Sequence, residues 1–252
     1  MRRTAPGRSA WLPYPAAAQA APLRLFCLPH AGGGATAYRS WVRQPDGRVE
    51  VVPVQPPGRE SRRSEPRPDT VAMLVRELAA ALLPWLDAPF ALLGNSMGSV
   101  VAFELARYLA ERHGRSPEHL FVAASAAPHC ARPNLPRFDL LSDGELIAFL
   151  ADRYRGIPEA LLRSPELLAL FTPVLRADLE LLRGYRPGPL PVLSCPVTAF
   201  IGAGDPLPRE LVDQWRAVTI GPFERVELPG GHFALLEEGS RVIELLGKAA
   251  PR

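Results

Sequence analysis

The sequence predicts an α/β fold: a mostly parallel sheet with helices on both faces and a helical lid insertion. Short apolar runs alternate with helical patterns along the chain, which is typical of a parallel sheet with crossover helices. The runs are mostly apolar, as expected for strands buried on both faces. A chain of 252 residues, 47% of them hydrophobic, can bury the core of one large α/β domain or of two small ones.

Six apolar runs are the predicted strands. They cover residues 23–29, 49–55, 90–94, 119–125, 197–202 and 225–230. Helical patterns lie between or after them, over residues 69–86, 98–114, 208–218 and 240–250. Asp69 is a suitable N-cap for the first of these helices, and Gly114 is a suitable C-cap for the second.

Residues 130–188 interrupt this alternation and predict the helical lid. Ser142 and Glu145 form a capping box, and Ser164 followed by Pro165 begins a second helix. No strand pattern occurs for roughly seventy residues, so the segment is expected over the carboxyl edge of the sheet, where open α/β folds bind ligands. Its apolar side chains either pack on the sheet in the ordinary way or line a pocket for an apolar chain. The candidates for such a pocket are Phe138, Phe149, Phe171 and Leu175, together with His30 and Asn95 outside the insertion.

The N-terminal 21 residues are expected to be a flexible tail ahead of a single domain over residues 22–252. Arg8, Pro13 and Pro15 interrupt the apolar centre that an export signal would need. Three widely spaced cysteines fit neither a disulfide framework nor a metal site, and are typical of a reducing cytoplasm. No apolar run is long enough for a membrane span.

A net charge of +3 is too small to indicate nucleic-acid binding, but it is compatible with an acidic protein partner. The densest basic stretch is "GRESRRSEPRP", residues 58–68. We interpret it as a solvated loop, with a docking surface as the alternative.

The stretch Gly94-Asn95-Ser96-Met97-Gly98 matches the pattern G-x-S-x-G, in the setting of strand, sharp turn and helix that a nucleophilic serine requires. Such a serine sits in a strained turn, so the flanking positions must be small to let strand and helix pass closely. The helix that begins beneath it can stabilise negative charge. We therefore predict that Ser96 is a nucleophile.

A serine nucleophile needs a base and an orienting acid. His232 follows the last strand in a glycine-containing turn, and is the expected base. The acid should lie between serine and histidine in chain order. Asp205 follows a strand and is the expected acid, because it can hold the imidazole tautomer and stabilise the imidazolium. Asp178 and Asp213 are alternatives, although both lie within helical patterns.

Two backbone N–H groups should bind the oxyanion. Met97 follows the nucleophile and supplies one, and Ala31 in the loop "PHAGGG" supplies the other. The same loop allows a second interpretation, because residues 32–37 also satisfy the dinucleotide pattern G-x-G-x-x-A. That interpretation needs an acidic residue at the end of the second strand, where residues 55–57 are Gln-Pro-Pro.

Together these motifs resemble the type II thioesterases, stand-alone editing enzymes of the α/β-hydrolase fold that accompany nonribosomal peptide and polyketide synthases. The resemblance covers residues 22–246, and it depends on "LFCLPHAGGGATAYRSW", "VVPVQPPGRE", "GNSMGSVVAFELA", "PELLALFTPVLRADLELLRGY", "FIGAGDPL" and "LPGGHFALLEE". It implies a triad of Ser96, Asp205 and His232, oxyanion donors at Ala31 and Met97, and a mobile lid over about residues 130–185. One departure is Asn95, where the family usually has histidine.

The resemblance also implies the substrate: an acyl group in thioester linkage to the phosphopantetheine arm of an acyl or peptidyl carrier protein. Neither a metal nor an organic cofactor is implied. We expect a cytoplasmic monomer that binds neither nucleic acid nor membrane. The alternatives are an esterase or an acyltransferase or cyclase of the same fold, and, in another class, a non-catalytic binding protein.

Overall fold

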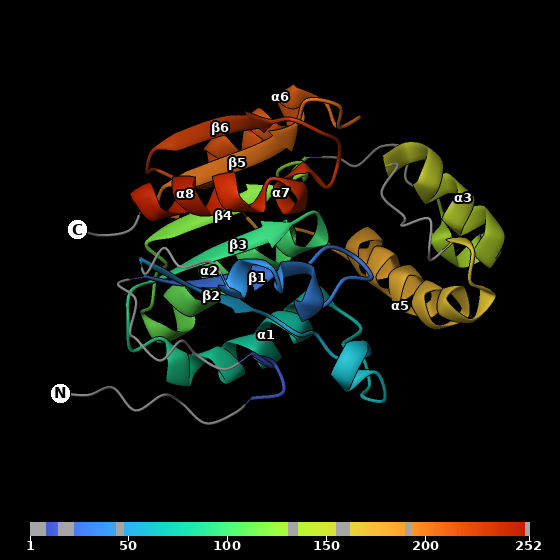
Figure 1. The fold of residues 1–252 in the computed structure, drawn as a ribbon. Helices are drawn as coiled ribbons and strands as arrows, with labels where there is room; N and C mark the ends of the chain where they lie inside the picture. Colours follow the sequence, from blue (N-terminus) through green and yellow to red (C-terminus); the bar gives the residue numbers. More distant parts are fainter. Residues whose placement is uncertain are drawn as a thin grey trace.

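The computed structural model describes residues 9–14, 23–43, 48–130, 136–154, 162–189 and 193–249 (Figure 1). Within these residues the chain forms a sheet with helices on both faces and a helical lid at one edge. This is the layered arrangement predicted from the sequence.

The described sheet has six strands, all parallel, in the order β2-β1-β3-β4-β5-β6. Their bounds are β1 Leu23–Leu28, β2 Val49–Pro53, β3 Phe90–Asn95, β4 His119–Ala123, β5 Val197–Gly202 and β6 Phe223–Leu228. Gly94 of β3 pairs with Leu28 of β1, and Asn95 pairs with Ala123 of β4. The central strands therefore end at the same level, and the loops that follow them meet at one edge.

Helices cover both faces of the sheet. Their bounds are α1 Val71–Leu82, α2 Met97–His113, α6 Arg209–Asp213, α7 Ala234–Glu237 and α8 Gly239–Ala249. The short 3-10 helices outside the lid are η1 Ala35–Tyr38, η2 Trp41–Arg43, η3 Glu60–Arg62, η4 Leu83–Trp85 and η6 Gln214–Val218. Helices α1, α2 and α6 with η6 pack on one face, and α7, α8, η1 and η2 pack on the other (Figure 1).

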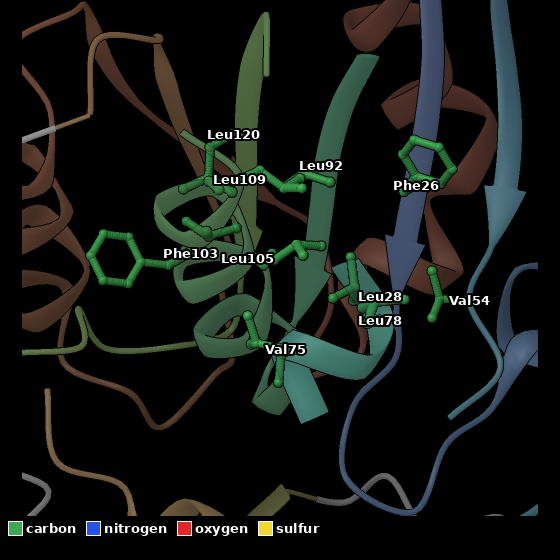
Figure 2. Packing of buried hydrophobic residues seen from close by; sticks show 14 of the residues in the cluster. Phe26, Leu28, Val54, Val75, Leu78, Leu92, Phe103, Leu105, Leu109 and Leu120 are labelled. Atoms are coloured by element: carbon green, nitrogen blue, oxygen red, sulfur yellow. The ribbon is translucent and has the colours of Figure 1, made fainter. Parts of the chain in front are cut away.

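The larger core lies between the sheet and helices α1 and α2. Figure 2 shows Leu92 of β3 and Leu28 of β1 facing Leu105 of α2 and Leu78 of α1. The start of α1 differs by one residue from the prediction. Its N-cap is Thr70, whose hydroxyl accepts a hydrogen bond from the Met73 N–H, and not Asp69. The predicted C-cap of α2, by contrast, is confirmed at Gly114, which adopts the left-handed conformation.

The lid lies between β4 and β5 in the chain and consists of η5 Phe138–Leu140, α3 Asp143–Tyr154 and α5 Pro165–Gly184. Both predicted caps are confirmed. Ser142 and Glu145 exchange the hydrogen bonds of a capping box, and the Ser164 hydroxyl accepts from the Leu167 N–H. Figure 1 shows α3 and α5 beyond the carboxyl ends of the strands, where the sequence placed them. Residues 131–135 and 155–161 of the predicted lid lie outside the described residues.

Two expectations need correction. The predicted tail over residues 1–21 is not loose at residues 9–14, because Trp11 is only 8% exposed and packs beneath the Arg62 guanidinium. The Gln55 N–H also donates to the Trp11 carbonyl oxygen. The basic stretch is not a wholly solvated loop, since Arg59 and Arg62 are buried. Both guanidiniums are satisfied by internal acceptors, which is why burial is tolerated.

Candidate active site

Ser96 occupies a sharp turn between β3 and α2. Its φ of 53° lies in the left-handed region, which is strained for a non-glycine residue and is frequent at functional sites. The strand ends at Asn95 and the helix begins at Met97, so one residue carries the whole change of direction. The Ser96 N–H donates to the Ala123 carbonyl oxygen, which ties this turn to β4. The predicted strand–turn–helix setting is present.

The glycines on either side of Ser96 are required by close approach of the backbone. A Cβ at Gly94 would lie 2.1 Å from the Gly98 carbonyl oxygen. A Cβ at Gly98 would lie 2.2 Å from the Leu28 carbonyl oxygen. No side chain fits at either position, because helix, turn and strand are in van der Waals contact there.

His232 lies in the loop between β6 and α7, with its Nε2 3.2 Å from the Ser96 Oγ. Its Nδ1 lies 2.9 Å from the Asp205 Oδ2. A carboxylate on Nδ1 favours the tautomer with the proton there, which leaves Nε2 free to accept the serine proton. The imidazole is largely buried.

Asp205 follows β5, and its side chain is fully buried. Its Oδ1 accepts from the Leu207 N–H at 3.0 Å, so each carboxylate oxygen has a donor. The loop that carries Asp205 is joined to the loop that carries His232 by the bond from the Gly204 N–H to the Gly230 carbonyl oxygen. This backbone pairing fixes the separation of acid and base.

The two alternative acids have other partners. Asp178 forms a buried ion pair with Arg59, and Asp213 pairs with Arg225 near the surface. Neither contact involves His232, whose Nδ1 faces Asp205. Among the candidates, Asp205 is therefore the residue that the fold brings to the imidazole.

The two expected oxyanion donors come from different elements of the fold. Met97 is the first residue of α2, where N–H groups have no acceptor within the helix and the helix dipole favours negative charge. Ala31 follows β1 in a loop that packs against both the main core and the lid. The dinucleotide alternative for this loop lacks its structural context. The glycines lead into η1, a helix of four residues, and not into the longer helix whose N-terminus would bind a pyrophosphate.

The six expected substrate-binding residues separate into two groups. Phe138 and Asn95 are fully buried, so neither lines a ligand site in this structure. Asn95 belongs to the side of β3 that carries Ala91 and Leu93, and these contact the core on the α7 and α8 face. The strand alternation thus directs its side chain into the core.

Of the other four, three belong to the lid helices and His30 lies in the loop after β1. Phe149 and Phe171 are partly buried in the apolar cluster formed by the lid helices. The Phe171 ring lies against Gly32, in the loop that carries Ala31. Leu175 is nearly buried beside the same glycine. His30 contacts the Phe233 ring edge-on, at 5.0 Å between centroids. Desolvation, with smaller contributions from His232 and Arg59, lowers the pKa of His30 to about 4, so its imidazole is neutral at physiological pH.

Sequence reasoning missed two side chains that touch this site. The Tyr154 ring, at the end of α3, lies 4.2 Å from the His232 ring between centroids. Phe233 contacts both His232 and His30. No sequence signal marks Tyr154, because its place over the imidazole depends on how the lid docks.

A family model described as the thioesterase domain matches residues 23–250. The chain belongs to the thioesterase family. This thioesterase is therefore a hydrolase of thioester bonds. It is 37% identical over 232 residues to the gramicidin S biosynthesis protein GrsT of Aneurinibacillus migulanus, covering 91% of this chain and 89% of that protein.

Comparison with solved structures supports the same family. RedJ, the thioesterase of the prodiginine pathway in Streptomyces coelicolor, superposes with a TM-score of 0.84 at 40% identity, covering 97% of this chain and all of RedJ. BorB, the type II thioesterase of the borrelidin cluster, superposes with a TM-score of 0.82 at 37% identity, covering 91% of this chain and 93% of BorB. This thioesterase thus resembles proteins of three biosynthetic pathways over nearly its whole length.

Proposed function

We propose that this thioesterase removes acyl groups from the phosphopantetheine arm of acyl or peptidyl carrier proteins, and so frees synthases blocked by a wrong or stalled unit. The observation that carries the proposal is the pair of hydrogen bonds that links Ser96, His232 and Asp205 at the carboxyl edge of the sheet. Its likeness to BorB, a type II thioesterase, and to GrsT, a biosynthesis protein, supports the pathway.

In this proposal the Ser96 Oγ attacks the thioester carbonyl as the His232 Nε2 takes its proton. The negative charge on the carbonyl oxygen is bound by the N–H groups of Ala31 and Met97. The carbon–sulfur bond then breaks, and the phosphopantetheine thiol leaves with the proton from His232. The buried Asp205 carboxylate stabilises the imidazolium in between.

Water completes the cycle. His232 takes a proton from a water molecule, which attacks the acyl-serine ester, and the same proton returns to the Ser96 Oγ as the free acid leaves. The partly buried Phe149 and Phe171 of the lid are the proposed contacts of an apolar acyl chain. The net charge of +3 suits an acidic carrier domain. We also propose that the protein is a monomer. The odd number and wide spacing of its cysteines support a reducing compartment, the cytoplasm.

The decisive experiment loads carrier proteins with acetyl, medium-chain or aminoacyl groups and follows the loss of acyl mass. The wild-type protein should release at least one of these groups, and Ser96→Ala should leave every species loaded. The matched control is Ser116→Ala, which changes an exposed serine outside the site and should retain full activity. If Ser96→Ala releases acyl groups at the wild-type rate, Ser96 is not the nucleophile.

Three further results would change the substrate or the class. Rapid cleavage of simple esters with no action on loaded carriers would indicate an esterase. Transfer of the acyl group to an amine or alcohol would indicate an acyltransferase or cyclase. A fluorophosphonate probe that fails to label Ser96 would support a binding protein without catalysis.

A further inference from the structure

The loop that carries Ala31 is held by side chains from two distant parts of the chain. The Gly32 N–H donates to the Asp178 Oδ2 at 2.8 Å. The Gly33 carbonyl oxygen accepts from the Arg59 Nη1 at 3.1 Å. The peptide group between Ala31 and Gly32 is therefore fixed by a carboxylate of lid helix α5, and the peptide group that begins at the Gly33 carbonyl is fixed by a guanidinium from the segment before η3.

Arg59 and Asp178 also bind each other through two parallel hydrogen bonds. The Arg59 Nη1 lies 2.5 Å from the Asp178 Oδ2, and the Nη2 lies 2.8 Å from the Oδ1. The two side chains are only 7% and 6% exposed. This fork geometry is the strongest arrangement available to an arginine and a carboxylate, and it fixes orientation as well as distance.

Stability alone is a poor explanation for this pair. Burying two charges costs so much desolvation that replacing a buried ion pair by apolar side chains is often neutral or stabilising. The pair instead fixes the orientation of the loop that carries Ala31, because each partner makes one further hydrogen bond to the backbone of that loop.

The lid helix adds a second contact to this loop. Gly32 adopts a φ of +76°, and a Cβ there would lie 2.7 Å from the Phe171 ring. Leu175, one turn before Asp178, lies beside the same glycine. Helix α5 thus contacts the loop through the apolar side chains of Phe171 and Leu175, and it forms a hydrogen bond to the loop through Asp178.

We propose that Arg59 and Asp178 are positioning residues, which set the Ala31 N–H in place to receive the oxyanion. This inference rests on the proposed roles of Ser96 and Ala31. It follows that the part of α5 around Asp178 belongs to the catalytic assembly. A lid movement that separates α5 from the loop would also dismantle the oxyanion site.

The test compares kinetics with stability in two kinds of variant, assayed with an acyl thioester. Asp178→Asn keeps the shape of the side chain and removes its charge. It should lower kcat about 10- to 100-fold with little change in KM, less than the roughly 100- to 1000-fold loss on deleting an oxyanion donor. The matched control is Glu50→Gln, in the buried Arg24–Glu50 pair between β1 and β2. It should lose comparable stability and keep its kcat.

The double variant Arg59→Met/Asp178→Leu separates positioning from folding. Because no charge is left unpaired, its melting temperature should lie above that of Asp178→Asn, in which Arg59 has lost its anionic partner. Its kcat should nevertheless stay 10- to 100-fold low. Its affinity for a trifluoromethyl ketone, whose adduct with Ser96 is an oxyanion, should fall by a similar factor. Wild-type kcat in this folded double variant would overturn the inference.

Failure of the underlying function is distinguishable from failure of the inference. If Ser96→Ala hydrolyses the thioester as fast as the wild type, the proposed nucleophile is wrong and the positioning role falls with it. If Ser96→Ala is inactive but the double variant keeps full kcat, only the positioning role is refuted.

Discussion

Replacing Asn95 with valine should make this thioesterase more stable. The Asn95 side chain exposes none of its surface, and neither its Oδ1 nor its Nδ2 has a hydrogen-bond partner among the described residues. It lies at the end of β3 on the same side of the strand as Leu93, which belongs to the apolar core on that face of the sheet. A buried polar group without a partner is destabilising, so this residue weakens the fold.

The expected gain in unfolding free energy depends on the two polar groups of the Asn95 amide and on the difference in volume between asparagine and valine. Each buried unsatisfied group costs about 1–3 kcal/mol. Valine removes both, suits a strand, and adds a small volume whose overpacking costs about 1 kcal/mol or more. The net expectation is a gain of about 2 kcal/mol, or about 4–8 °C in melting temperature for a chain of this length.

The measurement is thermal and urea unfolding of wild type, Asn95→Val and Asn95→Asp, with thioesterase activity followed in parallel. The aspartate variant buries a charge without a partner, so it should melt well below the wild type. Asn95→His restores the residue usual in type II thioesterases and should keep activity within about tenfold, or roughly 1.4 kcal/mol of barrier. A melting temperature for Asn95→Val clearly below that of the wild type would refute the reasoning, because it would mean that the amide contributes favourable hydrogen bonds.

Three other predictions test the site and the fold. Asp205→Asn should lower kcat roughly a thousandfold to ten-thousandfold and leave the circular dichroism spectrum unchanged, because an amide cannot hold the His232 tautomer that a carboxylate holds. A loss of kcat below tenfold would argue against Asp205 as the acid of the triad. Gly98→Ala should cost about 3 kcal/mol or more in urea unfolding, because its Cβ meets the backbone, whereas Gly144→Ala in α3 meets nothing within 4 Å and should gain about 0.5–1 kcal/mol. Burial lowers the pKa of His119 from 6.5 to about 4, so the unfolded chain binds the extra proton. The stability from His119 is therefore complete above about pH 6.5 and lost as the pH falls towards about 4, and His119→Gln should flatten this part of the stability profile against pH.

The sequence was a good guide where local chemistry leaves few choices. The strands were recognisable because parallel strands buried on both faces are mostly apolar. The lid helices could be placed from Ser142 and Ser164, because an N-cap satisfies backbone donors within a few residues of itself. Those signals depend on neighbours in the chain, so they can be read without knowing the fold.

The sequence was a poor guide where a side chain contacts a partner far away along the chain. The basic stretch at 58–68 looked solvated, yet Arg59 finds its carboxylate 119 residues later in the lid. Trp11 looked like part of a loose tail, yet it is covered by Arg62. Charge and composition report the cost of burying a group, but the partner that offsets that cost is known only once the chain has folded.

By itself the sequence determined the fold class and named the residues whose chemistry must act together, because a serine nucleophile requires a strained turn, a base and an acid in a restricted order. Only the tertiary structure decided which acid reaches His232, that Asn95 is buried, and that Asp178 holds the loop that carries Ala31. The reason is geometric. Hydrogen bonds act over about 3 Å, and distances of that size between remote residues are set by the packing of the whole domain.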